Sequence, residues 1–146
     1  MVNLKLTSSA FSDGGEIPRE CGYKNGNKAP PLTINGIPDG TKSLALIMDD
    51  PDAMEPAWKV WVHWVVWNID PTTTELENLT EEGMTDFGEE GYGGPAPPDK
   101  RHTYVFKLYA LDTKLDLPSE STKADVEKAM EGHIIEQATL TGTYAP

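Results

Sequence analysis

Two distant segments of the sequence place ionisable residues where an apolar strand ends, and such residues could build a small polar pocket. In SLALIMDDPDA an apolar run stops at Asp49, Asp50 and Asp52. In GYGGPAPPDKRHTYVFKLYALD a Gly/Pro loop leads through His102 into another strand, and between the two segments VWVHWVVWNID carries His63. A carboxylate beside a histidine orients the ring and favours its charged form. The sequence therefore predicts a pocket of carboxylates and histidines on a β framework.

The Gly/Pro loop suggests what this pocket binds. Gly93 and Gly94 can leave backbone N–H groups pointing into a concavity, which is an anion-binding arrangement. Tyr104 shares a strand face with His102, because side chains two residues apart in a strand point the same way. We expect a pocket for a phosphate-like anion.

The same residue types also have ordinary structural roles and could support different chemistry. Asp-Pro-Asp is common in turns, and a histidine among Val and Trp is often part of the core. Two His and two Asp would suit zinc or iron by ligand type, but their spacings match no metal signature. No serine lies in a nucleophile elbow. A small phosphoester hydrolase or metal-dependent enzyme using the same pocket is the alternative to a non-enzymatic binding protein, which we favour. We assign no catalytic residue, metal ligand or cofactor.

The elements that would position these residues are mainly strands. Residues 43–48 and 60–69 are apolar on both faces, as in the covered centre of a sheet. Residues 2–7, 103–111 and 133–143 are predicted as further strands, the first of them at an edge. Of the tryptophans in residues 60–69, Trp64 and Trp67 are expected to fill the core.

One helix is predicted after these strands. Thr122 can cap its N-terminus, Asp125 falls in its first turn, and Gly132 provides the stop. Its apolar stripe consists of Val126, Ala129 and Met130. We expect a mainly β fold, an antiparallel β-sandwich with one or two peripheral helices, in a single domain over residues 1–146.

Composition excludes several classes of partner. The formal net charge of −12 over 146 residues argues against nucleic acid and against docking on an anionic membrane surface. No apolar run approaches membrane-spanning length, and the N-terminus has no signal-peptide pattern. Cys21 is the one cysteine, so no intrachain disulfide forms, and it carries no nucleophile signature. These features predict a cytoplasmic protein without integral membrane association.

The three motifs, taken in order, resemble the phosphatidylethanolamine-binding protein family, in particular its short prokaryotic branch related to the Raf kinase inhibitor protein. The upstream pieces IPRE, APPL and GIPDGTKSLAL match the layout of that branch. The resemblance extends from about Ile17 to Tyr144. It implies a β-sandwich of two antiparallel sheets with a small anion pocket at one end, and relatives that inhibit kinases or proteases.

The resemblance also implies a set of ligand-binding residues. The residues that match the family's motifs are Asp50, Asp52, His63, Gly94, Pro95, His102 and Tyr104. We expect Asp50 to hold His63 as a cation, His102 to donate to the anion and Gly94 to offer its backbone N–H. A kinase or protease is the expected protein partner, and a homodimer is left open because the tryptophans could serve a dimer face as easily as a core.

Two departures from the family's pattern put parts of the pocket in question. Met54 stands where the aspartate motif continues with proline, and Thr103 stands where an arginine usually follows the histidine. Arg101 precedes the histidine instead, and we expect it to point elsewhere.

Overall fold

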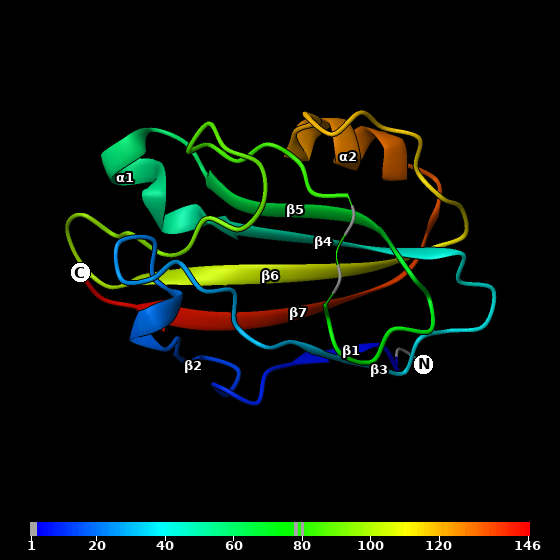
Figure 1. Cartoon of the computed structure of the whole chain (residues 1–146), viewed down its shortest axis with the longest axis horizontal. Coiled ribbons are helices and arrows are strands. Elements are labelled where there is room, and N and C mark those ends of the chain that lie inside the picture. The colour runs from blue at the N-terminus through cyan, green and yellow to red at the C-terminus, as the bar shows by residue number, and fades with distance from the viewer. Residues whose placement is uncertain (1–2, 78, 80) are drawn as a thin grey trace.

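The structure is a computed structural model that describes residues 3–77, 79 and 81–146. A five-stranded sheet with the order β2-β7-β6-β4-β5 runs through the molecule (Figure 1). Its strands are β2 (Gly15–Glu16), β4 (Ser43–Asp50), β5 (Trp61–Ile69), β6 (His102–Leu111) and β7 (Ile134–Tyr144). A second, two-stranded sheet pairs β1 (Lys5–Thr7) with β3 (Thr33–Asn35).

The apolar runs in the sequence determine which strands lie at the centre. Every residue of β4 is buried, and β5 is buried over nearly its whole length, in agreement with their apolar character on both faces. One face packs on the small sheet and the N-terminal loops, where Leu6, Ile17 and Ile34 join the main core. Trp64 and Trp67 are buried core residues, as predicted.

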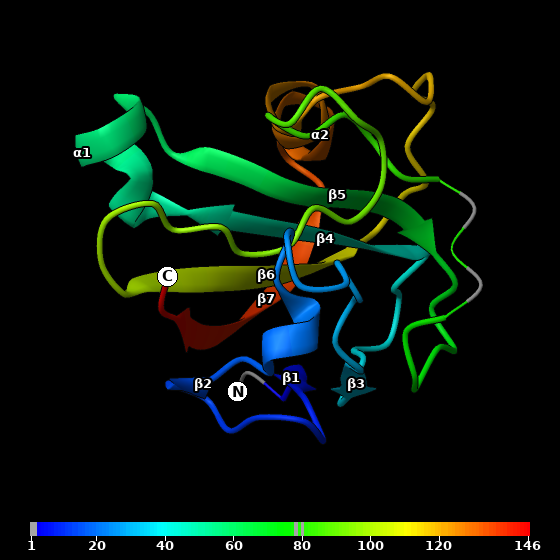
Figure 2. The same ribbon diagram turned by 60° about the vertical axis from the view of Figure 1, so that its left-hand side comes forward.

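Helix α2 (Lys123–Met130) covers the opposite face of the sheet, as the two views in Figures 1 and 2 show. Thr122 and Asp125 form a reciprocal capping box, in which each side chain accepts a hydrogen bond from the other residue's backbone N–H. Val126 and Met130 are buried in a second core cluster with Ala45, Ile47 and Val65, and Ala129 packs against it. The predicted helix is confirmed with its cap and its apolar stripe.

The mainly β fold is confirmed, with one difference in strand pairing. The described strands pair antiparallel except for β2, which lies parallel to β7 through Gly15–Gly142 and Glu16–Thr143. This pair is too short to produce a hydrophobic pattern in the sequence. The predicted strand at residues 2–7 is β1, although Val2 lies outside the described residues.

Short helical turns connect β4 to β5 at one end of the sheet. The 3₁₀ helix η2 (Pro51–Ala53) begins at Asp50, whose side chain accepts a hydrogen bond from the Asp52 N–H, and α1 (Met54–Ala57) follows directly. A further 3₁₀ turn, η1 (Arg19–Cys21), lies in the N-terminal loops. In the part of the chain that the structure describes, no helix is long and apolar enough to cross a membrane.

Candidate functional site

A cavity of about 210 Å³ opens at the end of the sheet that carries α1. Because β4 runs antiparallel to both β5 and β6, the last residues of β4 lie beside the first residues of its neighbours. Asp50 is the register partner of Trp61, and Asp49 is the register partner of Val105. The cavity is lined by Asp50, Ala53, Ala57, Trp61, His63, Phe87, Ala96, Pro98, His102 and Tyr104. The structure thus brings together four of the seven predicted site residues.

His102 is held between two carboxylates. Its Nδ1 lies 2.6 Å from Asp50 Oδ2, and its Nε2 lies 2.8 Å from Asp99 Oδ1. Ionised carboxylate oxygens only accept, so with both carboxylates ionised each ring nitrogen carries a proton and His102 is an imidazolium. Burial lowers the pKa of His102, but the hydrogen bonds and charges of Asp50 and Asp99 outweigh it and leave this pKa above its ordinary value. Burial raises the pKa of Asp50, against the effect of the bond from His102.

The expected pairing of Asp50 with His63 is wrong. His63 Nδ1 lies 2.7 Å from the carbonyl oxygen of Gly93, to which it donates its proton. Burial is the main cause that lowers the pKa of His63 to about 4. The ring meets Phe87 and Tyr104 edge-on, with centroids 5.3 and 5.1 Å away. His63 is therefore a neutral member of the cavity wall whose Nε2 is an acceptor.

Asp52 and the residues around it stabilise the edge of the site. Asp52 Oδ2 accepts a hydrogen bond of 2.8 Å from the Thr103 N–H and ties η2 to the start of β6. Arg101 points away, as expected, since its guanidinium lies 3.2 Å from Thr143 Oγ1 and 3.7 Å from a Glu16 carboxylate oxygen. Asp52 and Arg101 do not line the cavity.

The Gly/Pro loop forms a support for the cavity and not an anion nest. The Gly94 N–H donates to Asn27 Oδ1 at 2.7 Å, so in this structure it is already paired and does not point into the cavity as a free donor. The Gly93 N–H donates to the His63 carbonyl at 2.8 Å, and the Pro95 carbonyl accepts from the Tyr23 N–H at 2.9 Å. These bonds fix the loop so that Ala96 and Pro98, and not Gly94 and Pro95, reach the cavity.

Two polar groups of the cavity wall lack a hydrogen-bond partner among the described residues, namely the Tyr104 hydroxyl and the Trp61 Nε1–H. Burial is the largest cause that raises the pKa of Tyr104, followed by the negative charge of Asp50. The Ala96 amide opposes this shift without forming a well-oriented hydrogen bond. The Trp67 Nε1–H, which does not line the cavity, lacks a partner among the described residues as well. Buried polar groups are usually satisfied, so the two groups of the cavity wall are donors with unused hydrogen-bonding capacity.

Sequence patterns did not reveal the aromatic wall or the role of Asp99. Phe87 lies in the acidic connection after β5, where no periodic pattern predicts burial, yet its ring stacks on Tyr23 at 4.1 Å. Asp99 stands three residues before His102, and this spacing is the signal that could have revealed the contact. Asp49 faces the other side of the sheet and pairs with Lys123 of α2 at 2.7 Å.

The described residues offer neither a reactive cysteine nor a cluster of metal ligands. Cys21 is buried, and burial is the main cause that raises the pKa of its thiol to about 11, so the thiolate that nucleophilic attack requires is scarce. Among residues 3–77, 79 and 81–146, no three or more His, Cys, Asp or Glu side chains are arranged to hold a metal ion.

Comparisons with known proteins point to one family. The family described as "Phosphatidylethanolamine-binding protein" matches residues 7–145. A UPF0098 protein of Methanothermobacter thermautotrophicus is 46% identical, over 97% of this chain and 98% of the relative. The crystal structure of a putative phosphatidylethanolamine-binding protein homologue from Chlamydia trachomatis is 39% identical with a TM-score of 0.92, over 97% of this chain and 96% of that one.

A more distant structure shares the fold alone. A carboxypeptidase Y inhibitor, solved in complex with its cognate proteinase, is 18% identical with a TM-score of 0.62, over 96% of this chain and 81% of that one.

Proposed function

The chain belongs to the phosphatidylethanolamine-binding protein family, and we propose that it is a non-enzymatic binding protein whose cavity takes a small oxyanion, such as a phosphorylated group. The observation that carries this proposal is the His102 imidazolium at the cavity, in a wall that also contains two unpartnered donors. An oxyanion would accept from the Tyr104 O–H and the Trp61 N–H and be attracted by the charge of His102.

The site residues divide into two roles under this proposal. Trp61, His102 and Tyr104 bind the anion, and His63 closes the wall as a neutral ring. Asp50 acts indirectly, because it orients His102 and keeps it charged while its own charge repels an anion. Asp52, Gly94 and Pro95 hold the loops that shape the cavity.

We further propose that the bound group belongs to a protein partner that this chain inhibits. The inhibitor of carboxypeptidase Y supports a protease as the partner, although that relative shares only the fold. A kinase partner remains a prediction from the family resemblance. The net charge of −12 favours a partner with a basic surface.

Titration with phosphate and phosphoethanolamine, followed by NMR of the three histidines, tests the anion site. We expect shifts at His63 and His102 but not at His133. His133 is the natural control because it precedes β7 beside Leu111, at the far end of β6 from His102.

The variant Tyr104→Phe separates binding from stability. It removes a hydroxyl that has no partner in the described structure and retains the ring, so we expect several-fold weaker anion binding with unchanged or higher stability. Unchanged affinity in this variant, or equal shifts at all three histidines, would contradict the proposed site.

A further inference from the structure

We infer that Asp99 is a built-in competitor that occupies the outer N–H of His102, and that the cavity therefore selects singly charged oxyanions. This inference rests on the proposed function. Asp99 lies within the motif of the Gly/Pro loop but is not one of the seven predicted site residues, and here it receives a role in selecting the charge of the ligand.

The two carboxylates on His102 differ in how easily they can leave. The Asp50 side chain is 4% exposed, and its other oxygen accepts the Asp52 N–H at 2.9 Å, so β4 and η2 hold it in place. The Asp99 side chain is 38% exposed and lies on a surface loop. The Asp99 carboxylate is already partly hydrated and gains further hydration when it rotates into water. Moving Asp50 would instead leave a buried charge without its partner. Asp99 is therefore the exchangeable partner.

Displacement of Asp99 would release a strong donor at the edge of the cavity. The His102 side chain is only 1% exposed while Asp99 covers it, and the neighbouring residue Pro98 lines the cavity. An oxyanion that replaces the Asp99 carboxylate takes over a charge-assisted hydrogen bond on Nε2. Its other oxygens can then accept from Tyr104 and Trp61.

The balance of charge decides which anions fit. Asp50 and Asp99 carry one negative charge each and His102 one positive charge, so the bridged cluster has a net charge of −1. A carboxylate or a phosphodiester that replaces Asp99 restores this balance. A phosphomonoester dianion adds a second negative charge close to the buried carboxylate of Asp50, where screening by water is weak. The overall charge of −12 acts in the same direction.

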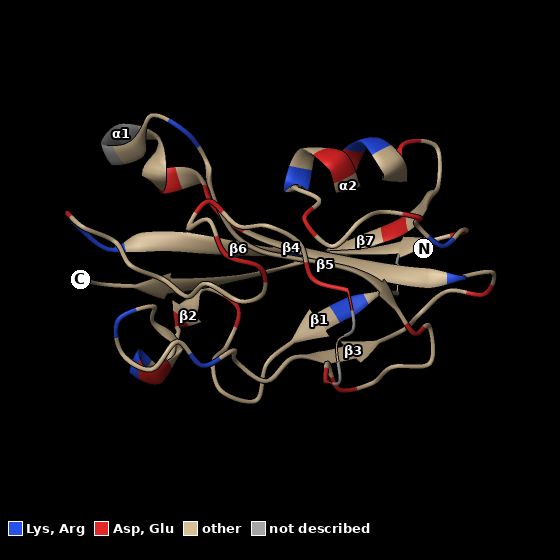
Figure 3. Cartoon of the chain, turned by 45° about the horizontal axis from the view of Figure 1, so that its top comes forward, with Lys and Arg blue, Asp and Glu red and all other residues tan. Residues whose placement is uncertain are grey.

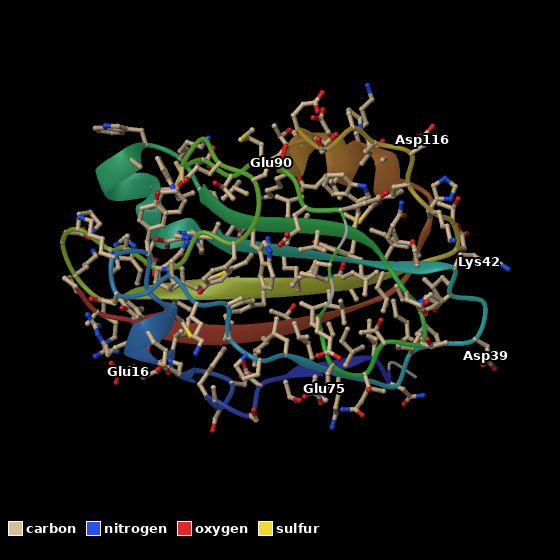
Figure 4. All side chains as sticks on the ribbon, in the orientation of Figure 1. Glu16, Asp39, Lys42, Glu75, Glu90 and Asp116 are labelled. Atoms are coloured by element: carbon tan, nitrogen blue, oxygen red, sulfur yellow. The ribbon has the colours of Figure 1, made fainter. Side chains whose placement is uncertain are left out.

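A simpler role for Asp99 would be to cap its own turn. The Lys100 N–H and the Asp99 N–H both interact with the Asp99 carboxylate. Asparagine caps such turns equally well, so Asp99→Asn removes the charge and keeps the turn. Asp39→Asn is the matched control, because Asp39 is exposed at the opposite end of the molecule from α1 and changes the net charge by the same amount (Figure 4).

The experiment measures the affinities of the wild type and of both variants by calorimetric titration at pH 7.5. The probes are acetate, dimethyl phosphate and methyl phosphate, of which the last is mainly a dianion at this pH. We expect the wild type to bind both monoanions more tightly than methyl phosphate. Asp99→Asn should bind acetate about tenfold more tightly, since a competing charge-assisted bond is lost. Asp39→Asn should match the wild type within about twofold, as expected for a distant screened charge.

Each contrary result overturns a specific statement. Binding of acetate with equal affinity to the wild type and Asp99→Asn refutes the competitor role and leaves the anion site standing. Tighter binding of methyl phosphate than of both monoanions refutes the charge selection. If both statements hold, tighter binding of one monoanion than of the other identifies the carboxylate or the phosphodiester as the natural group. No binding of any probe to any of the three proteins refutes the proposed function together with this inference.

Discussion

The three histidines of this chain show how strongly local contacts decide the chemistry of one residue type. His63 is surrounded by aromatic rings and donates to a backbone carbonyl, so burial keeps it neutral. His102 is equally buried but contacts two carboxylates, which hold it charged. His133 lies on the surface beside Asp112. Of these three, only His102 combines a positive charge with a place in the cavity wall.

The opposite environments of the two buried histidines predict opposite titrations. In proton NMR we expect the midpoint of His63 below pH 5, because its pKa is about 4, and the midpoint of His102 above the ordinary value near 6.5. A midpoint of His63 near 6.5 would contradict its neutral, buried placement.

The sequence could predict these residue types but not their partners. The order of neighbours in the sheet, β5-β4-β6, places histidines on both sides of Asp50, one on each adjacent strand. Which of them meets the carboxylate depends on register and on the twist of strand ends, and residue patterns do not contain this information. For this reason the sequence predicts a pairing of Asp50 with His63, whereas the structure pairs Asp50 with His102.

The lowered pKa of His63 also makes stability depend on pH. The unfolded chain protonates this histidine below about pH 6.5, whereas the folded protein does so only near pH 4, so acid favours unfolding between these values. The raised pKa of His102 acts in the opposite sense: its contribution is fully present below about pH 6.5 and is lost as the pH rises through the raised value. Relative to His63→Gln, the wild type should lose about 2 kcal/mol between pH 7 and pH 5 in denaturant unfolding. Equal losses in both proteins would refute the link.

At the scale of single elements, most of the framework follows from local patterns. Strands apolar on both faces predicted β4 and β5, and the capping residues predicted α2. The strands β2 and β3 and the helix α1 have too few residues for a period to be visible, and the pairing of β1 with β3 and of β2 with β7 depends on tertiary contacts. Figure 3 shows that the long strands of the sheet are mostly uncharged and that the charges gather in loops and on α2. This distribution agrees with the burial of β4 and β5.

The residue that caps the C-terminus of α1 adopts a backbone conformation that is unfavourable for its side chain. Trp58 has a φ of 63°, the left-handed conformation that glycine usually adopts at a helix C-terminus, and it is 85% exposed. A residue with a Cβ strains the backbone at this φ, and the exposed indole buries little surface that could offset the strain. The preceding residue, Ala57, is the last residue of α1 and lines the cavity, so this strain lies beside the site.

Replacement of Trp58 should show this strain directly. We expect Trp58→Gly to be more stable than Trp58→Ala by about 1 kcal/mol in thermal unfolding, because only glycine adopts the left-handed conformation without cost. Both variants lose the indole, so the comparison isolates the backbone. If Trp58→Ala were as stable as Trp58→Gly, the conformation at this position would not be strained.

At the scale of the whole molecule, the site depends on segments that are far apart in the sequence. Loop 91–98 reaches the cavity because it is bound to the N-terminal loops through Asn27 and Tyr23. Tyr144 of β7 closes the same region, since its hydroxyl donates to the Arg19 carbonyl and accepts from Asn25. Contacts between distant parts of the chain thus determine the shape of a cavity whose polar residues come from the strands.

Gly94 is the position where this dependence can be tested. A Cβ at Gly94 would lie 2.0 Å from the carbonyl oxygen of Cys21 and 2.9 Å from the backbone nitrogen of Tyr23, so the two loops could not keep their approach. We expect Gly94→Ala to lower the free energy of unfolding by about 2–3 kcal/mol. It should also weaken acetate binding, because Ala96 and Pro98 move with the loop. The variant touches none of the anion donors, and so a loss of affinity would come from the loop alone.

Gly40→Ala separates this effect from a general loss of stability. Gly40 has a φ of 87° with no atom within 4 Å of an added Cβ, and it lies next to Asp39 at the far end of the molecule (Figure 4). Its replacement should cost about 1 kcal/mol through the backbone alone and leave acetate affinity unchanged. If Gly94→Ala lost stability and kept its affinity for acetate, the loop would stabilise the fold without shaping the cavity. The anion site would then depend only on the ends of β4, β5 and β6.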